Sequence, residues 1–138
     1  NYFELGFDEI SINTTLKNNK FTFDGATFPP IFTFETKNKL KSGEISFSFE
    51  NEKPFLTKKC KLLTDKDNQT TFACGDFEFD LGENYPNENN LNITYTVIDK
   101  NGIRYSAVLN GELSDDTSFG VSKKSVSFPN GKSISTDL

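Results

Sequence analysis

The chain has 138 residues, enough for one compact domain, and its 20 acidic and 15 basic residues give a formal net charge of −5. An acidic chain lacks the basic surface that displaces counterions from nucleic acid, which argues against a nucleic-acid partner. The absence of His excludes Ser/His/Asp triads, Cys/His dyads and most zinc sites. We expect no catalysis, cofactor or metal and, without an apolar run of about 18 residues, no membrane insertion.

Apolar and polar residues alternate along most of the chain, and a period of two places one set on one face of a β-strand. The clearest stretches are 21–23, 32–34, 45–49, 77–79 and 103–109. The turn signals between strands are Pro29-Pro30, Ser42-Gly43, Asn101-Gly102 and Pro129-Asn130-Gly131. With about ten such strands, the sequence predicts an all-β protein, an antiparallel immunoglobulin-like β-sandwich spanning 1–138 as a single domain.

Several connections are predicted from local composition. Residues 36–40 fit a single helical turn, whereas 82–90 and 114–124 are polar and fit loops. Asn101-Gly102 is the strongest hairpin signal. Residues 65–70 are interpreted as a solvated hairpin tip rather than a calcium loop, because Thr70 stands where such a loop needs Gly.

Cys60 and Cys74 are the only cysteines. They would be inert or metal-seeking thiols in a reducing compartment and one disulfide in a secreted protein. Glycosylation sequons at Asn13, Asn68 and Asn92 favour the exported alternative, extracellular or at a cell surface. The chain begins at Asn1 rather than Met, which indicates a processed or excised segment of a longer surface protein.

Residues 32–34 (FTF) and 39–47 (KLKSGEISF) form one strand pattern. This pattern resembles the N-terminal immunoglobulin-like domain of microbial cell-surface adhesins, which include fungal agglutinin-like adhesins, yeast sexual agglutinin and staphylococcal fibrinogen-binding adhesins. Residues 59–61 (KCK) with 70–74 (TTFAC) resemble the disulfide segment of the fungal branch. Residues 125–135 (SVSFPNGKSIS) are similar to its closing strand pair.

The resemblance implies adhesion to a protein or peptide ligand on another cell or surface, without catalysis. Such adhesins hold an added peptide strand in a groove completed by an adjacent immunoglobulin-like domain, and a Lys neutralises the peptide's terminal carboxylate. Lys53 is the candidate for that role here, and a solvated loop Lys before Pro54 is the plain alternative. The rival functions are a carbohydrate-binding module, with Tyr2 and Tyr85 as stacking candidates, and a structural spacer in a surface protein.

Overall fold

A computed structural model describes residues 2–4, 11–17, 20–23, 31–50, 53–54, 56–75, 78–80, 90–114, 118–127 and 133–137, with side chains in 31–50, 53–54, 56–75 and 90–113. These residues form 12 strands and no helix. The strands are β1 (Tyr2–Glu4), β2 (Ser11–Lys17), β3 (Lys20–Phe23), β4 (Ile31–Glu35), β5 (Leu40–Phe49), β6 (Leu56–Lys66), β7 (Gln69–Ala73), β8 (Glu78–Asp80), β9 (Asn90–Asp99), β10 (Arg104–Ser114), β11 (Ser118–Ser127) and β12 (Ser133–Asp137).

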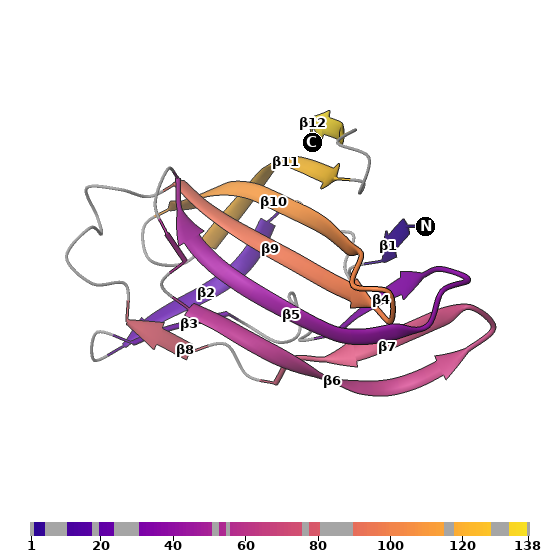
Figure 1. The fold of residues 1–138 in the computed structure, drawn as a ribbon. Helices are drawn as coiled ribbons and strands as arrows, with labels where there is room; N and C mark the ends of the chain where they lie inside the picture. Colours follow the sequence, from indigo (N-terminus) through magenta and orange to yellow (C-terminus); the bar gives the residue numbers. More distant parts are fainter. Residues whose placement is uncertain are drawn as a thin grey trace.

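The strand pairings are all antiparallel and follow one path (Figure 1). The order is β1-β4-β7-β6-β5-β9-β10-β11-β2-β3-β8, with β12 paired to β11. Six strands, β4-β7-β6-β5-β9-β10, enclose the core as one curled sheet, a half-barrel. The all-β prediction is therefore confirmed.

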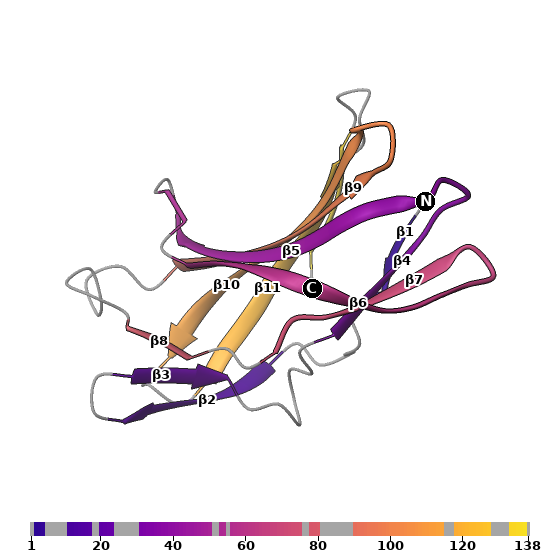
Figure 2. The ribbon, with the colours of Figure 1, turned by 60° about the horizontal axis from the view of Figure 1, so that its bottom comes forward.

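The sheet curls at β6, which pairs with a different strand along each half of its length. On one side of β6 lies the arm β5-β9-β10, and on the other side lies the arm β7-β4, here also called the curled arm. Residues 56–60, the inner half of β6, pair with β5 from Gly43↔Cys60 to Phe47↔Leu56. Residues 61–66, the outer half, pair with β7 from Lys61↔Ala73 to Lys66↔Gln69. The prediction of a sandwich of two separate sheets is therefore wrong for the described strands, because the ladder runs through β6 without a break. Figure 2 shows β5 turning away from the β6–β7 hairpin beyond this point.

Aromatic side chains join the two arms across the core. Phe32 on β4 stacks on Phe72 of β7, with ring centroids 5.2 Å apart, and meets Tyr95 of β9 edge-on at the same distance. Phe34 packs against Tyr105 of β10 with centroids 5.0 Å apart. Burial raises the pKa of the Tyr95 hydroxyl well above its usual value. The inward parity predicted for the Phe residues of 32–34 and 45–49 is confirmed, whereas the side chains of 21–23 and 77–79 lie outside the described residues.

Three local predictions are wrong. Ser42-Gly43 is not a turn but part of β5, and Gly43 is buried there. The ring of Phe72 lies so close to Gly43 that a Cβ atom at this position would be 2.9 Å from it. Residues 36–40 do not form a helical turn, because 37 and 38 are bends and Leu40 begins β5, and residues 118–124 belong to strand β11 rather than to a loop. The segments 81–89, 115–117 and 128–132 lie outside the described residues, and the stacking candidate Tyr85 belongs to the first of them.

The predicted hairpin at Asn101-Gly102 is confirmed, and Asp99 organises it. The buried Asp99 carboxylate accepts hydrogen bonds from the backbone N–H groups of Asn101 and Ile103, both at 2.9 Å. Gly102 has φ +82°, a left-handed conformation that favours glycine. Ile103 ends this turn with 37% of its surface exposed. The prediction that Ile103 lies in the core with Tyr105, based on their shared alternation, is therefore wrong for Ile103.

Candidate functional site

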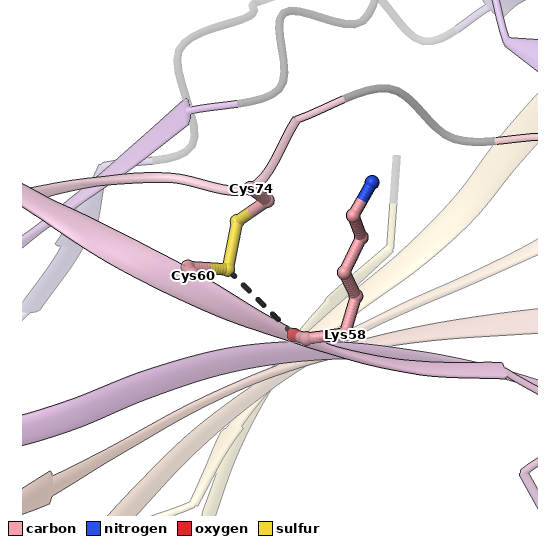
Figure 3. The surroundings of a disulfide bond; sticks show 3 residues. All are labelled: Lys58, Cys60 and Cys74. Atoms are coloured by element: carbon pink, nitrogen blue, oxygen red, sulfur yellow. Dashed lines mark hydrogen bonds between the residues drawn. A yellow bond between two sulfur atoms is a disulfide. The ribbon is translucent and has the colours of Figure 1, made fainter.

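The disulfide lies where β6 changes partners. Cys60, half-buried at the end of the inner half, bonds to the buried Cys74 just after β7, and their Cα atoms are 4.1 Å apart (Figure 3). Of the two alternatives left by the sequence, the disulfide is therefore the one present. It fixes β6 to the end of β7 at the base of the curled arm.

Lys58 is half-buried and lies on the same side of β6 as Cys60. This inward position is hard to recognise in the sequence, because several other lysines surround Lys58. The Cys60 Sγ atom lies 3.9 Å from the Lys58 carbonyl oxygen, a van der Waals contact because a disulfide sulfur has no proton to donate (dashed in Figure 3). The Lys58 ammonium lies 3.1 Å from where a Cβ on Gly75 would be. Gly75 also has φ +74°, so the chain leaving the disulfide favours glycine there.

The outer half of β6 presents an open edge. Its six side chains are all exposed, including Leu62 at 45% and Leu63 at 53%. On the side away from β7, pairing with β5 stops at Gly43↔Cys60, and no other described strand continues it. Alternate residues of an antiparallel strand direct N–H and C=O groups away from their partner. The outer half can therefore offer backbone hydrogen bonds beside two exposed leucines.

This open edge has the features that restrain pairing between identical sheets. Lys61 and Lys66 carry charge along it, and a register shift between Leu62 and Thr64 makes a bulge at Leu63. Neither lysine has an ion-pair partner among the described residues. The edge therefore disfavours a second copy of itself and favours a strand that carries acidic side chains.

The β6–β7 turn carries the Asn68 sequon. Asp67 and Asn68 have φ of 55° and 65°, the turn conformation of a two-residue hairpin. The Asp65 carboxylate accepts a hydrogen bond from the Thr70 hydroxyl at 3.2 Å, which ties together the two strands beside the turn. The interpretation as a hairpin tip is thus confirmed, and Asn68 is exposed there.

The other predicted site residues are dispersed. Asn92 is half-buried on β9, and its side-chain oxygen accepts a hydrogen bond from the Asn110 amide of β10. Asn13 lies in β2, opposite Ser118. Lys53 is exposed between the end of β5 and the start of β6, whereas the β6–β7 turn follows the other end of β6, so the structure does not bring Lys53 to the open edge. Glycosylation at the three sequons and a ligand role for Lys53 remain predictions.

A second surface gathers positive charge at the β6–β7 end of the sheet, where three turns meet. The Lys100 N–H donates to the Lys39 carbonyl at 2.8 Å, which joins the β9–β10 turn to the β4–β5 turn. The Thr36 N–H donates to the Asn68 carbonyl at 2.9 Å, which joins the β4–β5 turn to the β6–β7 turn. The first two turns and the strand residues beside them carry five exposed cations, here called the cationic turn surface: Lys37, Lys39, Lys41, Lys100 and Arg104.

The described residues include no group of three or more acidic or Cys side chains that could hold a metal ion. In that part of the chain there is also no helix long and apolar enough to cross a membrane.

Comparison with known proteins finds no matching family model, curated protein or solved structure. The functional argument therefore depends on the surfaces of this chain alone.

Proposed function

We propose that this chain is an extracellular recognition domain of a cell-surface protein, which binds an extended protein or peptide segment without catalysis. The open edge of β6 is the observation that carries the proposal. An added strand would take main-chain hydrogen bonds from the outer half of β6 and cover Leu62 and Leu63. Acidic residues in that strand would lie near Lys61 and Lys66.

The disulfide supports the extracellular part of the proposal. A bond between Cys60 and Cys74 persists in oxidising compartments and is rare in the cytosol. The likeness to microbial adhesins belongs to the proposal as well, with one amendment. The described strands form a curled sheet rather than two sheets, so a groove shared with an adjacent immunoglobulin-like domain would be additional to the β6 edge.

The carbohydrate-binding alternative depends on exposed aromatic rings. Among the described side chains, every Phe and Tyr is buried in the core. A stacking platform for neutral sugars therefore finds no support in this part of the chain. The spacer alternative predicts no ligand at all, and a binding experiment separates it from recognition.

A peptide screen tests the proposed function. The oxidised domain is screened against an array of ten-residue peptides, and the strongest binder is titrated by fluorescence polarisation against the domain and two variants. Leu63→Ser removes an exposed side chain from the open edge, whereas Ile103→Ser removes a similarly exposed one from the β9–β10 turn. Leu63→Ser should weaken binding about tenfold, since part of a leucine's burial is lost, and Ile103→Ser should change it less than about twofold.

The same titration contains the contradicting results. Equal effects of the two substitutions would remove the open edge from the binding site. Absence of any peptide binder would contradict recognition of extended segments and support the spacer function.

A further inference from the structure

We propose that the cationic turn surface is a second binding site, one that takes an anionic polysaccharide, a sugar chain with regularly spaced carboxylate or sulfate groups. The site is separate from the open edge of β6. It depends on the juxtaposition of residues 37–41 with residues 100–104, which are 59 or more positions apart in the sequence.

The fold places the five cations on neighbouring backbone segments. Lys39 contacts the β9–β10 turn through the bond from the Lys100 N–H. Lys41 is the bulge residue of β5, next to Ser42, and Ser42 pairs with Ile98 of β9. Ile98 in turn pairs with Arg104 of β10. Three adjacent strands span about 10 Å, so the cations cover a strip rather than a point.

The five cations of this strip outnumber the accessible acidic groups beside them. None of the five cations has an ion-pair partner among the described residues. Of the acidic residues in these turns and at the strand ends beside them, Asp99 is fully buried and bonds to backbone N–H groups, and Glu35 accepts a hydrogen bond from the Gln69 side chain at 3.3 Å. Because the whole chain has a formal charge of −5, five exposed cations together are a local feature rather than a result of overall basicity.

The turns that carry the cations are held in place. Asp99 fixes the β9–β10 turn through two hydrogen bonds, and the Asn38 N–H donates to the Thr36 hydroxyl at 3.2 Å within the β4–β5 turn. The bond between Lys100 and Lys39 ties the two turns together. Fixed backbones under long side chains lower the cost of ordering the surface around a polymer.

The chemistry beside the cations favours a sugar chain over a protein. Ile103 is the one large exposed apolar residue of these two turns, so there is no apolar centre of the kind that anchors protein partners. Polar groups line a hollow of about 230 Å³ at the β4–β5 turn and could hydrogen-bond to sugar hydroxyls. The residues of this hollow are Glu35, Thr36, Lys37, Asn38 and Asn68.

Binding is measured with four defined polymers on the oxidised domain: dextran sulfate, polygalacturonate, uncharged dextran and poly-L-glutamate. Dextran sulfate and polygalacturonate should both bind, and dextran should not. Poly-L-glutamate should bind several-fold more weakly, because it offers charge without sugar hydroxyls. Raising the salt from about 0.05 M to about 0.5 M should abolish binding, since the cations are exposed and salt screens them.

Paired substitutions locate the site. Lys39→Gln with Lys100→Gln should weaken binding about tenfold, at roughly 0.7 kcal/mol for each exposed charge pair. The matched control, Lys53→Gln with Lys59→Gln, removes the same charge from exposed positions elsewhere and should change affinity less than about twofold. Leu63→Ser should leave polysaccharide binding unchanged, which separates this site from the proposed peptide site.

Four results would overturn the inference. Binding of dextran as strong as that of dextran sulfate would show that the charge of the polymer does not contribute to binding. Poly-L-glutamate binding as tightly as the acidic sugars would assign the surface to an acidic protein segment. Equal losses in the two double variants would mean a response to net charge alone. Absence of binding to both acidic polysaccharides at low salt would leave the cations as solvated turn residues.

Discussion

The two halves of β6 differ in packing although they are continuous in sequence. In the inner half, alternate residues are half-buried, and the strand pairs with β5 next to the core. In the outer half every side chain is exposed, and pairing is limited to β7. The difference shows that one strand can hold the fold together at one end and present an edge at the other. Stability and recognition should therefore respond to different substitutions.

The largest expected effect is in the core beneath the inner half. Phe47 is fully buried on β5, opposite Leu56 and Ile93, so Phe47→Ala should lower the free energy of unfolding by about 3–5 kcal/mol. Urea denaturation of the oxidised protein measures this change. Leu63→Ala in the outer half is the control, expected within about 0.5 kcal/mol of the parent. Comparable losses would mean that the two halves are equally involved in the core.

The disulfide should have the next largest effect. The bond closes a loop with a sequence separation of 14, and replacing both Cys60 and Cys74 by Ala should cost about 3 kcal/mol on the chain-entropy model. Denaturation curves with and without reductant give the same comparison on the parent protein. A midpoint that does not move on reduction would show that the curled arm is held by packing alone.

Gly43 tests the close contact between the arms. Its Cβ position lies 2.9 Å from three ring atoms of Phe72, so Gly43→Ala should force the ring aside and cost about 1–3 kcal/mol. Ser42→Ala, at the exposed neighbouring position, is the matched control and should change stability little. Thermal unfolding of both variants beside the parent measures the two changes, and a stabilising Gly43→Ala would mean that β5 and β7 are further apart than described.

The smallest effect is expected within the outer half. Leu62 lies opposite Phe72 in the β6–β7 ladder but is 45% exposed, so Leu62→Ala should cost less than about 1 kcal/mol. Thermal unfolding of Leu62→Ala beside Phe72→Ala provides the measurement. A cost near that of Phe72→Ala would place Leu62 in the core and remove it from the proposed peptide site.

Local patterns in the sequence were enough to predict much of the core. Strict alternation put Phe32, Phe34 and Phe47 on the inward face, and the cysteine pair gave the disulfide. Ile103 broke the parity rule because the Asp99 turn ends there, a side-chain effect that periodicity does not report. Gly43 was mistaken for a turn residue because the ring that excludes a side chain there lies 29 positions away in the sequence.

The candidate surfaces depend on pairings that local patterns do not contain. The division of β6 between β5 and β7 is set by non-local hydrogen bonding, so neither its open edge nor the single curled sheet was predicted. The alternation of Lys37, Lys39 and Lys41 was visible in the sequence. Their meeting with Lys100 requires the bond between two turns. Lys58 was hidden among neighbouring lysines, although its parity with Cys60 was available as a signal.

The central claim is that the outer half of β6 has an open backbone edge, and residue-resolved amide hydrogen exchange tests it most directly. Strand β9 is the internal reference, because it pairs with β5 on one side and β10 on the other. We predict slow exchange for the amides of residues 93–97 and fast exchange for alternate amides of residues 61–66. Uniform protection of residues 61–66 in the isolated domain would show that another segment already covers the edge, and would contradict the account.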